Sequence, residues 1–161
     1  MKKLLLSILS VLALSTAFSQ DLPNTAIKDM NGSQLNFNET HQAGKVTVYS
    51  FWATWCVPCK KELNTVSELY EDWTKKYNVK MIAVSIDDSR NSSKVKPYVD
   101  AQRWDFGVFL DINQDFKRAL NIQSVPFTVL IDQTGKIVYT HSGYVEGDET
   151  ILEEEIAKLS K

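Results

Sequence analysis

Two cysteines three positions apart, Cys56 and Cys59, most constrain the fold of this chain, because they stand where one sequence pattern gives way to another. Before them, residues 46–53 (VTVYSFWA) are rich in β-branched and aromatic residues, which indicates a buried strand. After them, apolar residues recur at helical spacing: Leu63, Val66, Tyr70, Trp73 and Tyr77. Pro58 suits the first turn of such a helix. The pair is therefore predicted at a strand-to-helix joint.

The remaining patterns alternate between strands and helices. Asn31-Gly32, between two strand-like runs, predicts a β-hairpin near the start of the domain. Further strands are predicted at 79–87, 106–111, 127–132 and 136–141, and further helices around 95–99, 113–120 and 148–161. With no internal repeat or linker, this order predicts one α/β domain whose sheet is covered by helices on both faces.

Residues 1–19 have the layout of a secretory signal peptide, with two lysines, an apolar run and small residues before a predicted cleavage after Ser19. The apolar run of residues 4–18 is short against the roughly 20 residues that span a bilayer, so a retained anchor is the weaker alternative. There is no cysteine near residue 20 to carry a lipid, which argues against a lipoprotein. We therefore expect an exported, periplasmic domain over residues 20–161.

The composition excludes some function classes. A formal net charge of −2 gives no general electrostatic footprint for nucleic acid or for anionic lipid. The content of 43% hydrophobic and 24% charged residues is ordinary for a globular protein, so the thiol pair carries the functional signal.

Four interpretations of the thiol pair compete. A zinc site needs four ligands, and the two histidines, His41 and His141, are too far apart in sequence to supply them; we expect both to be structural or exposed. A purely structural disulfide over so short a loop would restrict the unfolded chain little. A copper(I) site is a third interpretation, because soft thiolates suit that ion.

Redox exchange fits the placement best. Unpaired N–H groups and the positive end of the helix dipole would face Cys56 at the helix start, and such surroundings lower the pKa of a thiol. Cys56 is then the attacking sulfur. Cys59, one turn further along, would resolve the mixed disulfide that results.

The segment FWATWCVPCKKE resembles the active-site segment of the thioredoxin superfamily, and in particular the exported TlpA/ResA-like thiol-disulfide oxidoreductases. The resemblance extends in order over residues 22–160, through the Asn-Gly hairpin, the insert after VSID, SVPFTVLID and QTGKIVYTHSGY. It implies a thioredoxin-like fold, with a central mixed β-sheet flanked by helices, an N-terminal β-hairpin and a central helical insert. It also implies a redox-active disulfide with no further cofactor and no metal.

The same resemblance implies roles for three more residues. Pro126 would be a cis-proline facing the disulfide, and Val125 before it would offer backbone groups to an extended substrate segment. From their places beside the pair, we expect both Trp52 and Trp55 to pack around the site, and Trp55 also to shield Cys56 from water and contact substrate. Glu62 would exchange protons with the thiols, the alternative being an ordinary surface glutamate of an early helical turn.

Two departures from the family pattern narrow the expectation. Ser50 stands where thioredoxin has a buried acid, so we expect that proton path to be absent, and the GVxGxPET pattern of cytochrome c maturation members is replaced by IQSVPFT. We therefore expect a general, monomeric reductase of disulfides in other exported proteins, supplied with electrons by a membrane donor of the DsbD/CcdA kind. A disulfide-donating oxidase and a copper-handling protein are the alternatives.

Overall fold

The computed structural model describes residues 22–160. The predicted signal peptide, residues 1–19, lies outside the described residues, as does the predicted domain start at residue 20. Among the helices of the described range, none combines the length and the apolar character needed to cross a membrane.

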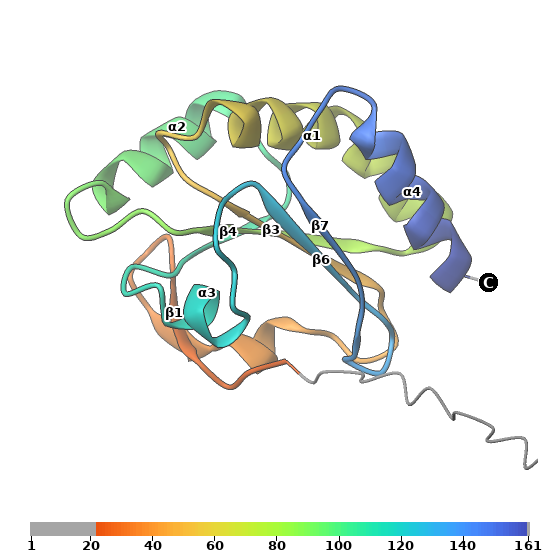
Figure 1. Ribbon diagram of the computed structural model, residues 1–161, viewed down its shortest axis with the longest axis horizontal. Helices are drawn as coiled ribbons and strands as arrows, with labels where there is room; N and C mark the ends of the chain where they lie inside the picture. Colours follow the sequence, from red (N-terminus) through yellow and green to blue (C-terminus); the bar gives the residue numbers. More distant parts are fainter. Residues whose placement is uncertain (1–21, 161) are drawn as a thin grey trace, which may run out of the picture.

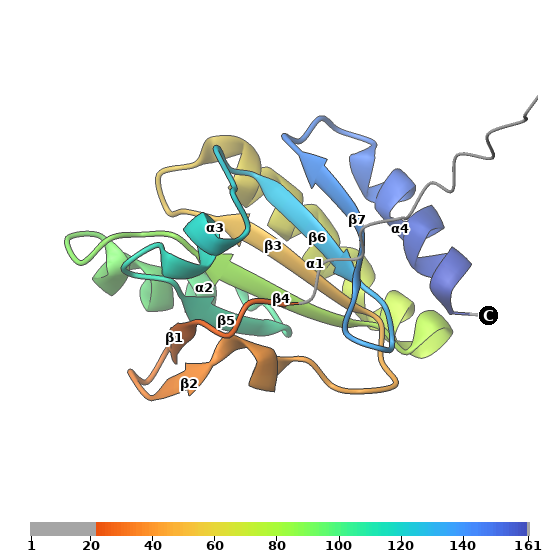
Figure 2. The same cartoon turned by 60° about the horizontal axis from the view of Figure 1, so that its bottom comes forward.

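A seven-stranded mixed sheet forms the centre of the domain (Figures 1 and 2). Its strands are β1 (Ala26–Asp29), β2 (Gln34–Asn36), β3 (Thr47–Trp52), β4 (Lys80–Ser85), β5 (Gly107–Leu110), β6 (Phe127–Ile131) and β7 (Ile137–Ser142). The spatial order is β2-β1-β5-β4-β3-β6-β7. The strands β3, β4 and β5 are parallel, and every other pairing is antiparallel. The β1–β2 hairpin and β7 therefore form opposite edges, as Figure 2 shows.

Helices cover both faces of this sheet. They are η1 (Phe37–Thr40), α1 (Val57–Tyr77), η2 (Ser92–Lys94), α2 (Val95–Gln102), α3 (Asp115–Ala119) and α4 (Asp148–Leu159). In Figure 1, α1, α2 and α4 lie above the sheet and α3 lies below it. The segment η2–α2 is the expected helical insert between β4 and β5. The predicted α/β class, the N-terminal hairpin and the insert are all confirmed.

The central strand β3 is buried along its whole length, and its side chains alternate between the two faces. Tyr49 packs against Phe37 of η1 with ring centroids 4.5 Å apart, and Phe51 packs against Phe116 of α3 at 4.9 Å. Trp52 points to the opposite face. This aromatic packing anchors β3 at the point where the chain leaves the sheet for α1.

Candidate active site

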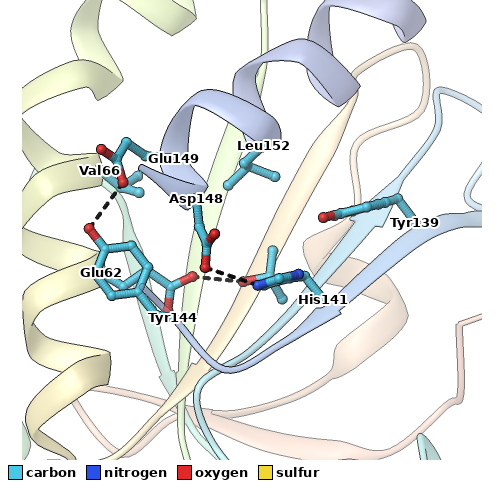
Figure 3. A pocket seen from close by; sticks show the side chains of 9 residues that line it. Glu62, Val66, Tyr139, His141, Tyr144, Asp148, Glu149 and Leu152 are labelled. Atoms are coloured by element: carbon cyan, nitrogen blue, oxygen red, sulfur yellow. Dashed lines mark hydrogen bonds and ion pairs between the residues drawn. The ribbon is translucent and has the colours of Figure 1, made fainter. Parts of the chain in front are cut away.

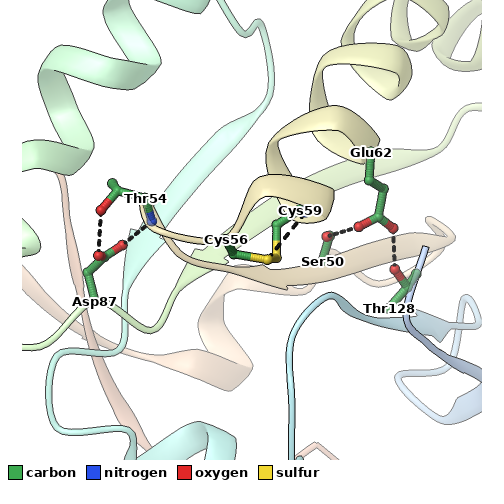
Figure 4. The surroundings of a disulfide bond; sticks show 7 residues. All are labelled: Ser50, Thr54, Cys56, Cys59, Glu62, Asp87 and Thr128. Carbon is green, nitrogen blue, oxygen red and sulfur yellow. Dashed lines mark hydrogen bonds between the residues drawn. A yellow bond between two sulfur atoms is a disulfide. The ribbon is translucent and has the colours of Figure 1, made fainter. Parts of the chain in front are cut away.

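The cysteine pair lies at the joint between β3 and α1, as predicted, and it forms a disulfide with Cα atoms 5.3 Å apart (Figure 4). Cys56 is the N-cap of α1, and its Sγ accepts a hydrogen bond from the backbone N–H of Cys59 at 3.3 Å. The backbone N–H of Cys56 donates to the carbonyl of Ala53 at 3.0 Å, and Pro58 occupies the first helical turn. The helix start therefore presents a donor and its positive dipole end to one sulfur.

The two sulfurs differ in access. Cys56 keeps 5% of its surface exposed, whereas Cys59 is fully buried. A sulfur from outside the protein therefore meets Cys56 first. In the reduced protein, the same N-terminal position favours the thiolate of Cys56 over its thiol.

A buried aspartate that the sequence reasoning missed holds the loop before the disulfide (Figure 4). The carboxylate of Asp87 accepts hydrogen bonds from the backbone N–H of Thr54 at 2.8 Å and from its hydroxyl at 2.7 Å. The Ser85 hydroxyl donates to the same carboxylate at 2.8 Å, and Asp87 has no exposed surface. The sequence pattern that could have identified Asp87 is an acidic residue directly after the buried strand that ends in VSI, at the end of the sheet where α1 begins.

Glu62 lies one turn beyond Cys59 on α1 and is only 6% exposed, so its interpretation as a surface glutamate is wrong. Its carboxylate accepts hydrogen bonds from the Thr128 hydroxyl at 2.9 Å and from the Ser50 hydroxyl at 3.4 Å. Burial raises the pKa of Glu62 to about 7, although the hydrogen bonds from Thr128 and Ser50 lower it; the charge of Asp148 raises it slightly further. A group with such a pKa can both accept and release a proton near neutral pH.

The contact between Ser50 and Glu62 places a buried acid beside this strand, although Ser50 itself is uncharged. Ser50 lies on β3 and carries no charge itself, but its hydroxyl reaches a carboxylate that descends from α1 (Figure 4). The helix thus supplies the buried acid that the strand lacks. The two positions are twelve residues apart, so periodicity within one element could not connect them.

The peptide bond between Val125 and Pro126 is cis, as expected. Pro126 is buried and Val125 is half-buried. The following residue, Phe127, pairs with Phe51 near the C-terminal end of β3. This loop therefore lies at the same end of the strands as the start of α1. The sheet therefore brings the Val125–Pro126 loop and the disulfide to one end of the domain.

Of the two tryptophans expected to pack around the site, Trp52 is buried and Trp55 is not. Trp55 is 60% exposed, and Val57 on the other side of Cys56 is 71% exposed. Trp52 is the tryptophan that packs, with its ring centroid 5.0 Å from that of Trp104 and 5.7 Å from that of Tyr98. Two exposed apolar side chains therefore flank the accessible sulfur.

Neither histidine lies at the disulfide. His41 Nδ1 lies 3.4 Å from the Thr47 hydroxyl, and the half-buried His141 lies 3.1 Å from Asp148. Within residues 22–160, no cluster of three or more His, Cys, Asp or Glu side chains is arranged to hold a metal ion.

Comparison with known proteins agrees with this geometry. The model of the Redoxin family matches residues 18–156. The thiol-disulfide oxidoreductase ResA of Bacillus subtilis is 30% identical over 129 residues, which cover 80% of this chain and 69% of that protein. The solution structure of an uncharacterized thioredoxin-like protein from Porphyromonas gingivalis is 43% identical, with a TM-score of 0.78, and the match covers 86% of this chain and 91% of that one.

A crystal structure described as a putative thiol:disulfide interchange protein DsbE from Chlorobium tepidum has a TM-score of 0.77, over 89% of this chain and 97% of that one. Its identity of 22% supports the fold alone. The family model matches most of the chain, and the relative ResA is a thiol-disulfide oxidoreductase. The cysteine pair at the start of α1 agrees with that activity. The chain therefore belongs to the Redoxin family, as a TlpA/ResA-like member of the thioredoxin superfamily, and is a thiol-disulfide oxidoreductase.

Proposed function

We propose that this oxidoreductase is exported to the periplasm, where it reduces disulfides in other exported proteins. The observation that carries the direction of attack is the contrast between the two sulfurs. Cys56 keeps 5% of its surface exposed and caps α1, whereas Cys59 has no exposed surface. A buried resolving thiol behind an accessible nucleophile is the arrangement that a two-step exchange requires.

The exchange proceeds in two steps. The Cys56 thiolate attacks one sulfur of the substrate disulfide, the substrate S–S bond breaks, and the released substrate sulfur leaves as a thiolate that takes up a proton. Cys59 then loses its proton and attacks Cys56 Sγ, which releases the second substrate sulfur. Two electrons pass to the substrate, and the protein is left with the Cys56–Cys59 disulfide.

Glu62 is the proposed acceptor of the Cys59 proton. It lies three residues further along the same helix, on the face that points toward the sheet (Figure 4). Its pKa of about 7 suits it to take up a proton at neutral pH and release it afterwards. Burial alone supplies most of that rise, so the carboxylate needs no second acid beside it.

The substrate segment is proposed to dock across the exposed side chain of Trp55 and the backbone of the Val125–Pro126 loop. Trp55 offers a large apolar surface, and an extended segment can pair with the backbone groups of Val125, just before the start of β6. This docking needs no specific side chain in the substrate other than its disulfide, which fits a general reductase.

Continued reduction in an oxidising compartment requires a source of electrons. We propose a membrane thiol donor of the DsbD/CcdA kind, which would reduce the Cys56–Cys59 disulfide by the reverse of the same exchange. Export depends on the predicted signal peptide, residues 1–19.

Trapping with Cys59→Ser tests the direction and the substrates together. The variant retains the attacking sulfur and lacks the resolving one, so it should accumulate mixed disulfides through Cys56 with oxidised exported proteins. Cys56→Ser is the matched control and should trap none. The reduction potential of the wild-type pair is expected well below the roughly −120 mV of strong oxidants, whereas a potential near that value would make the protein an oxidase instead.

A further inference from the structure

A small cavity that Glu62 helps to line lies between α1, β6, β7 and α4 (Figure 3). The side chains that line it are Glu62, Val66, Thr128, Tyr139, His141, Tyr144, Asp148, Glu149 and Leu152. The space open to the centre of a water molecule is about 10 Å³, which matches a single water site. Seven of these nine side chains carry a polar group, but apolar atoms make up most of the surface that faces the space, so a water there depends on the few polar atoms that reach it.

The polar side chains that line the cavity are arranged in space from the buried Glu62 to the partly exposed His141 and Asp148. Thr128, whose hydroxyl donates to Glu62, pairs directly with His141 across the β6–β7 ladder, so both side chains lie on one face of the sheet. His141 Nε2 lies 3.1 Å from Asp148 Oδ2. The side chains of His141 and Asp148 are 35% and 16% exposed, against 6% for the residue Glu62.

Asp148 is held in place from both sides. Its Oδ2 also accepts the backbone N–H of Val145 at 2.8 Å, at the start of α4. On the neighbouring wall, the Tyr144 hydroxyl donates to Glu149 at 3.0 Å, so that carboxylate is turned toward its own partner. In Figure 3 the carboxylates of Glu62 and Asp148 and the ring of His141 point toward the same space.

Each turnover requires Glu62 to lose the proton that it received from Cys59. With only 6% of its surface exposed, Glu62 has little direct contact with bulk water. An imidazole ring can accept a proton at one nitrogen and donate one from the other, which suits it to pass a proton along a chain of hydrogen bonds. The His141–Asp148 pair therefore has the chemistry needed to carry this proton outward.

We propose that the cavity binds one water molecule that passes protons between Glu62 and the His141–Asp148 pair, and so connects the buried acid to solvent. This inference rests on the proposed role of Glu62. The proton leaves Cys59 Sγ for a Glu62 oxygen and passes through the water to the Asp148 carboxylate. His141 Nε2, which lies 3.1 Å from Asp148 Oδ2, then takes it up, and the proton on Nδ1 leaves the ring for the solvent. His141 and Asp148 act through Glu62 and touch neither sulfur.

Two tyrosine hydroxyls, those of Tyr139 and Tyr144, also line the cavity. Tyr139 of β7 lies on the cavity wall, and burial raises its pKa, so it stays neutral in the working range. The pKa of Tyr144 is also raised, with burial as the largest cause. These two hydroxyls can orient the water but do not compete with His141 for its proton.

The test follows proton release and thiol oxidation in the same single turnover. Reduced protein is mixed in weak buffer at about pH 7 with 5,5′-dithiobis(2-nitrobenzoate), whose thiolate leaving groups stay unprotonated at this pH, so the Cys59 proton is released to the solvent. A pH indicator reports that proton, and tryptophan fluorescence reports the disulfide. In His141→Ala, the rate of proton release should be about 10-fold or more below that of the wild type. Millimolar imidazole should restore it, because a diffusible ring can replace the missing one.

His41→Ala is the matched control, since it removes the other histidine of the chain at a place outside the cavity. It should release protons at the wild-type rate and show no response to imidazole. Asp148→Asn should slow release as well, whereas Glu154→Gln removes an exposed carboxylate from the same helix and should not.

Wild-type kinetics in His141→Ala, or an equal imidazole response in His41→Ala, would overturn the relay. A high-resolution crystal structure should show one water bonded to Glu62, and a dry cavity would overturn the water site. Glu62→Gln separates the two proposals. If Glu62→Gln slows thiol oxidation and His141→Ala slows neither oxidation nor proton release, only the relay is contradicted. If Glu62→Gln oxidises at the wild-type rate, the proposed role of Glu62 is contradicted, and the relay with it.

Discussion

The Glu62 carboxylate on α1 accepts a 2.9 Å hydrogen bond from the Thr128 hydroxyl on β6, across a sequence separation of 66 residues. This bond ties the helix that carries the two cysteines to the strand that follows the cis-proline. A titratable group is thereby held in the core three residues after Cys59 on α1, where its protonation contributes to stability.

The first prediction concerns the pH dependence of stability. The folded-state pKa of Glu62 is raised from 4.5 to about 7, so the folded protein binds this proton more tightly than the unfolded chain does. Stability from this group is fully present below about pH 4.5 and is lost as the pH rises to about 7. The loss should be about 3 kcal/mol, and Glu62→Gln should not show it.

Urea unfolding of the oxidised proteins between about pH 4 and 8 measures this difference. The stability of Glu62→Gln relative to the wild type should increase with pH and level off above pH 7. Glu68→Gln, which changes an exposed carboxylate on the same helix, should follow the wild type throughout. Parallel curves for Glu62→Gln and the wild type would mean that folding does not raise the pKa of Glu62.

The second prediction concerns the loop that Asp87 holds. Asp87→Asn places an amide N–H₂ group against donors from Thr54 or Ser85, so at least one buried donor loses its acceptor. We expect a loss of about 2–4 kcal/mol in the free energy of unfolding. Thr54→Val removes the hydroxyl bond alone and should lose about 1–2 kcal/mol.

Denaturant unfolding measures the free energy of unfolding of both variants. Their rate of exchange with a small disulfide should also be lower than that of the wild type, because the loop positions Cys56. Asp100→Asn, a change of the same charge at a side chain that is 56% exposed, provides the control and should leave both quantities unchanged. Full stability in Asp87→Asn would show that the loop does not depend on these bonds.

The third prediction concerns the exposed tryptophan. Trp55→Ala should leave the thermal midpoint nearly unchanged, because the side chain is 60% exposed. It should lower kcat/KM for a protein disulfide by about 10-fold, the effect of losing a moderate apolar anchor. Exchange with oxidised glutathione, which is too small to cover the site, should change far less.

Val138→Ala, at a 47% exposed position on β7 near the opposite end of the β6–β7 ladder, is the control for exposed apolar surface. It should affect neither substrate. An equal loss on both substrates in Trp55→Ala would assign Trp55 to the chemistry of the sulfurs instead of to docking.

Much of the fold follows from local sequence patterns. The strand before Cys56, the long helix after it and the Asn-Gly hairpin are set by periodicity and turn chemistry, so they were predicted within a few residues. Strand order depends on which edges pair in three dimensions, and no local pattern records it; the overall arrangement came from the family resemblance.

The candidate site divides in the same way. Cys56 and Cys59 lie on one helical turn, so their relation could be read from spacing alone. The contacts of Glu62 with Ser50 and Thr128, and of Asp87 with Thr54, join separate elements. Burial is a property of the assembled fold, so the sequence could not decide whether Glu62 was a surface residue or whether Trp55 was packed.

The last prediction tests which sulfur attacks. In the reduced protein, iodoacetamide should modify Cys56 more than about 10-fold faster than Cys59, because only a thiolate that the reagent can reach reacts quickly. Cys56 satisfies both conditions: it keeps 5% of its surface exposed, and the N–H of Cys59 points at its sulfur. Peptide mass spectrometry over a time course measures the two rates separately. In urea the helix start and the burial are both lost, so the two rates should converge, which separates the effect of the fold from that of the local sequence. Faster modification of Cys59 in the folded protein would reverse the roles of the two cysteines and would redirect the trapping experiment to the Cys56→Ser variant.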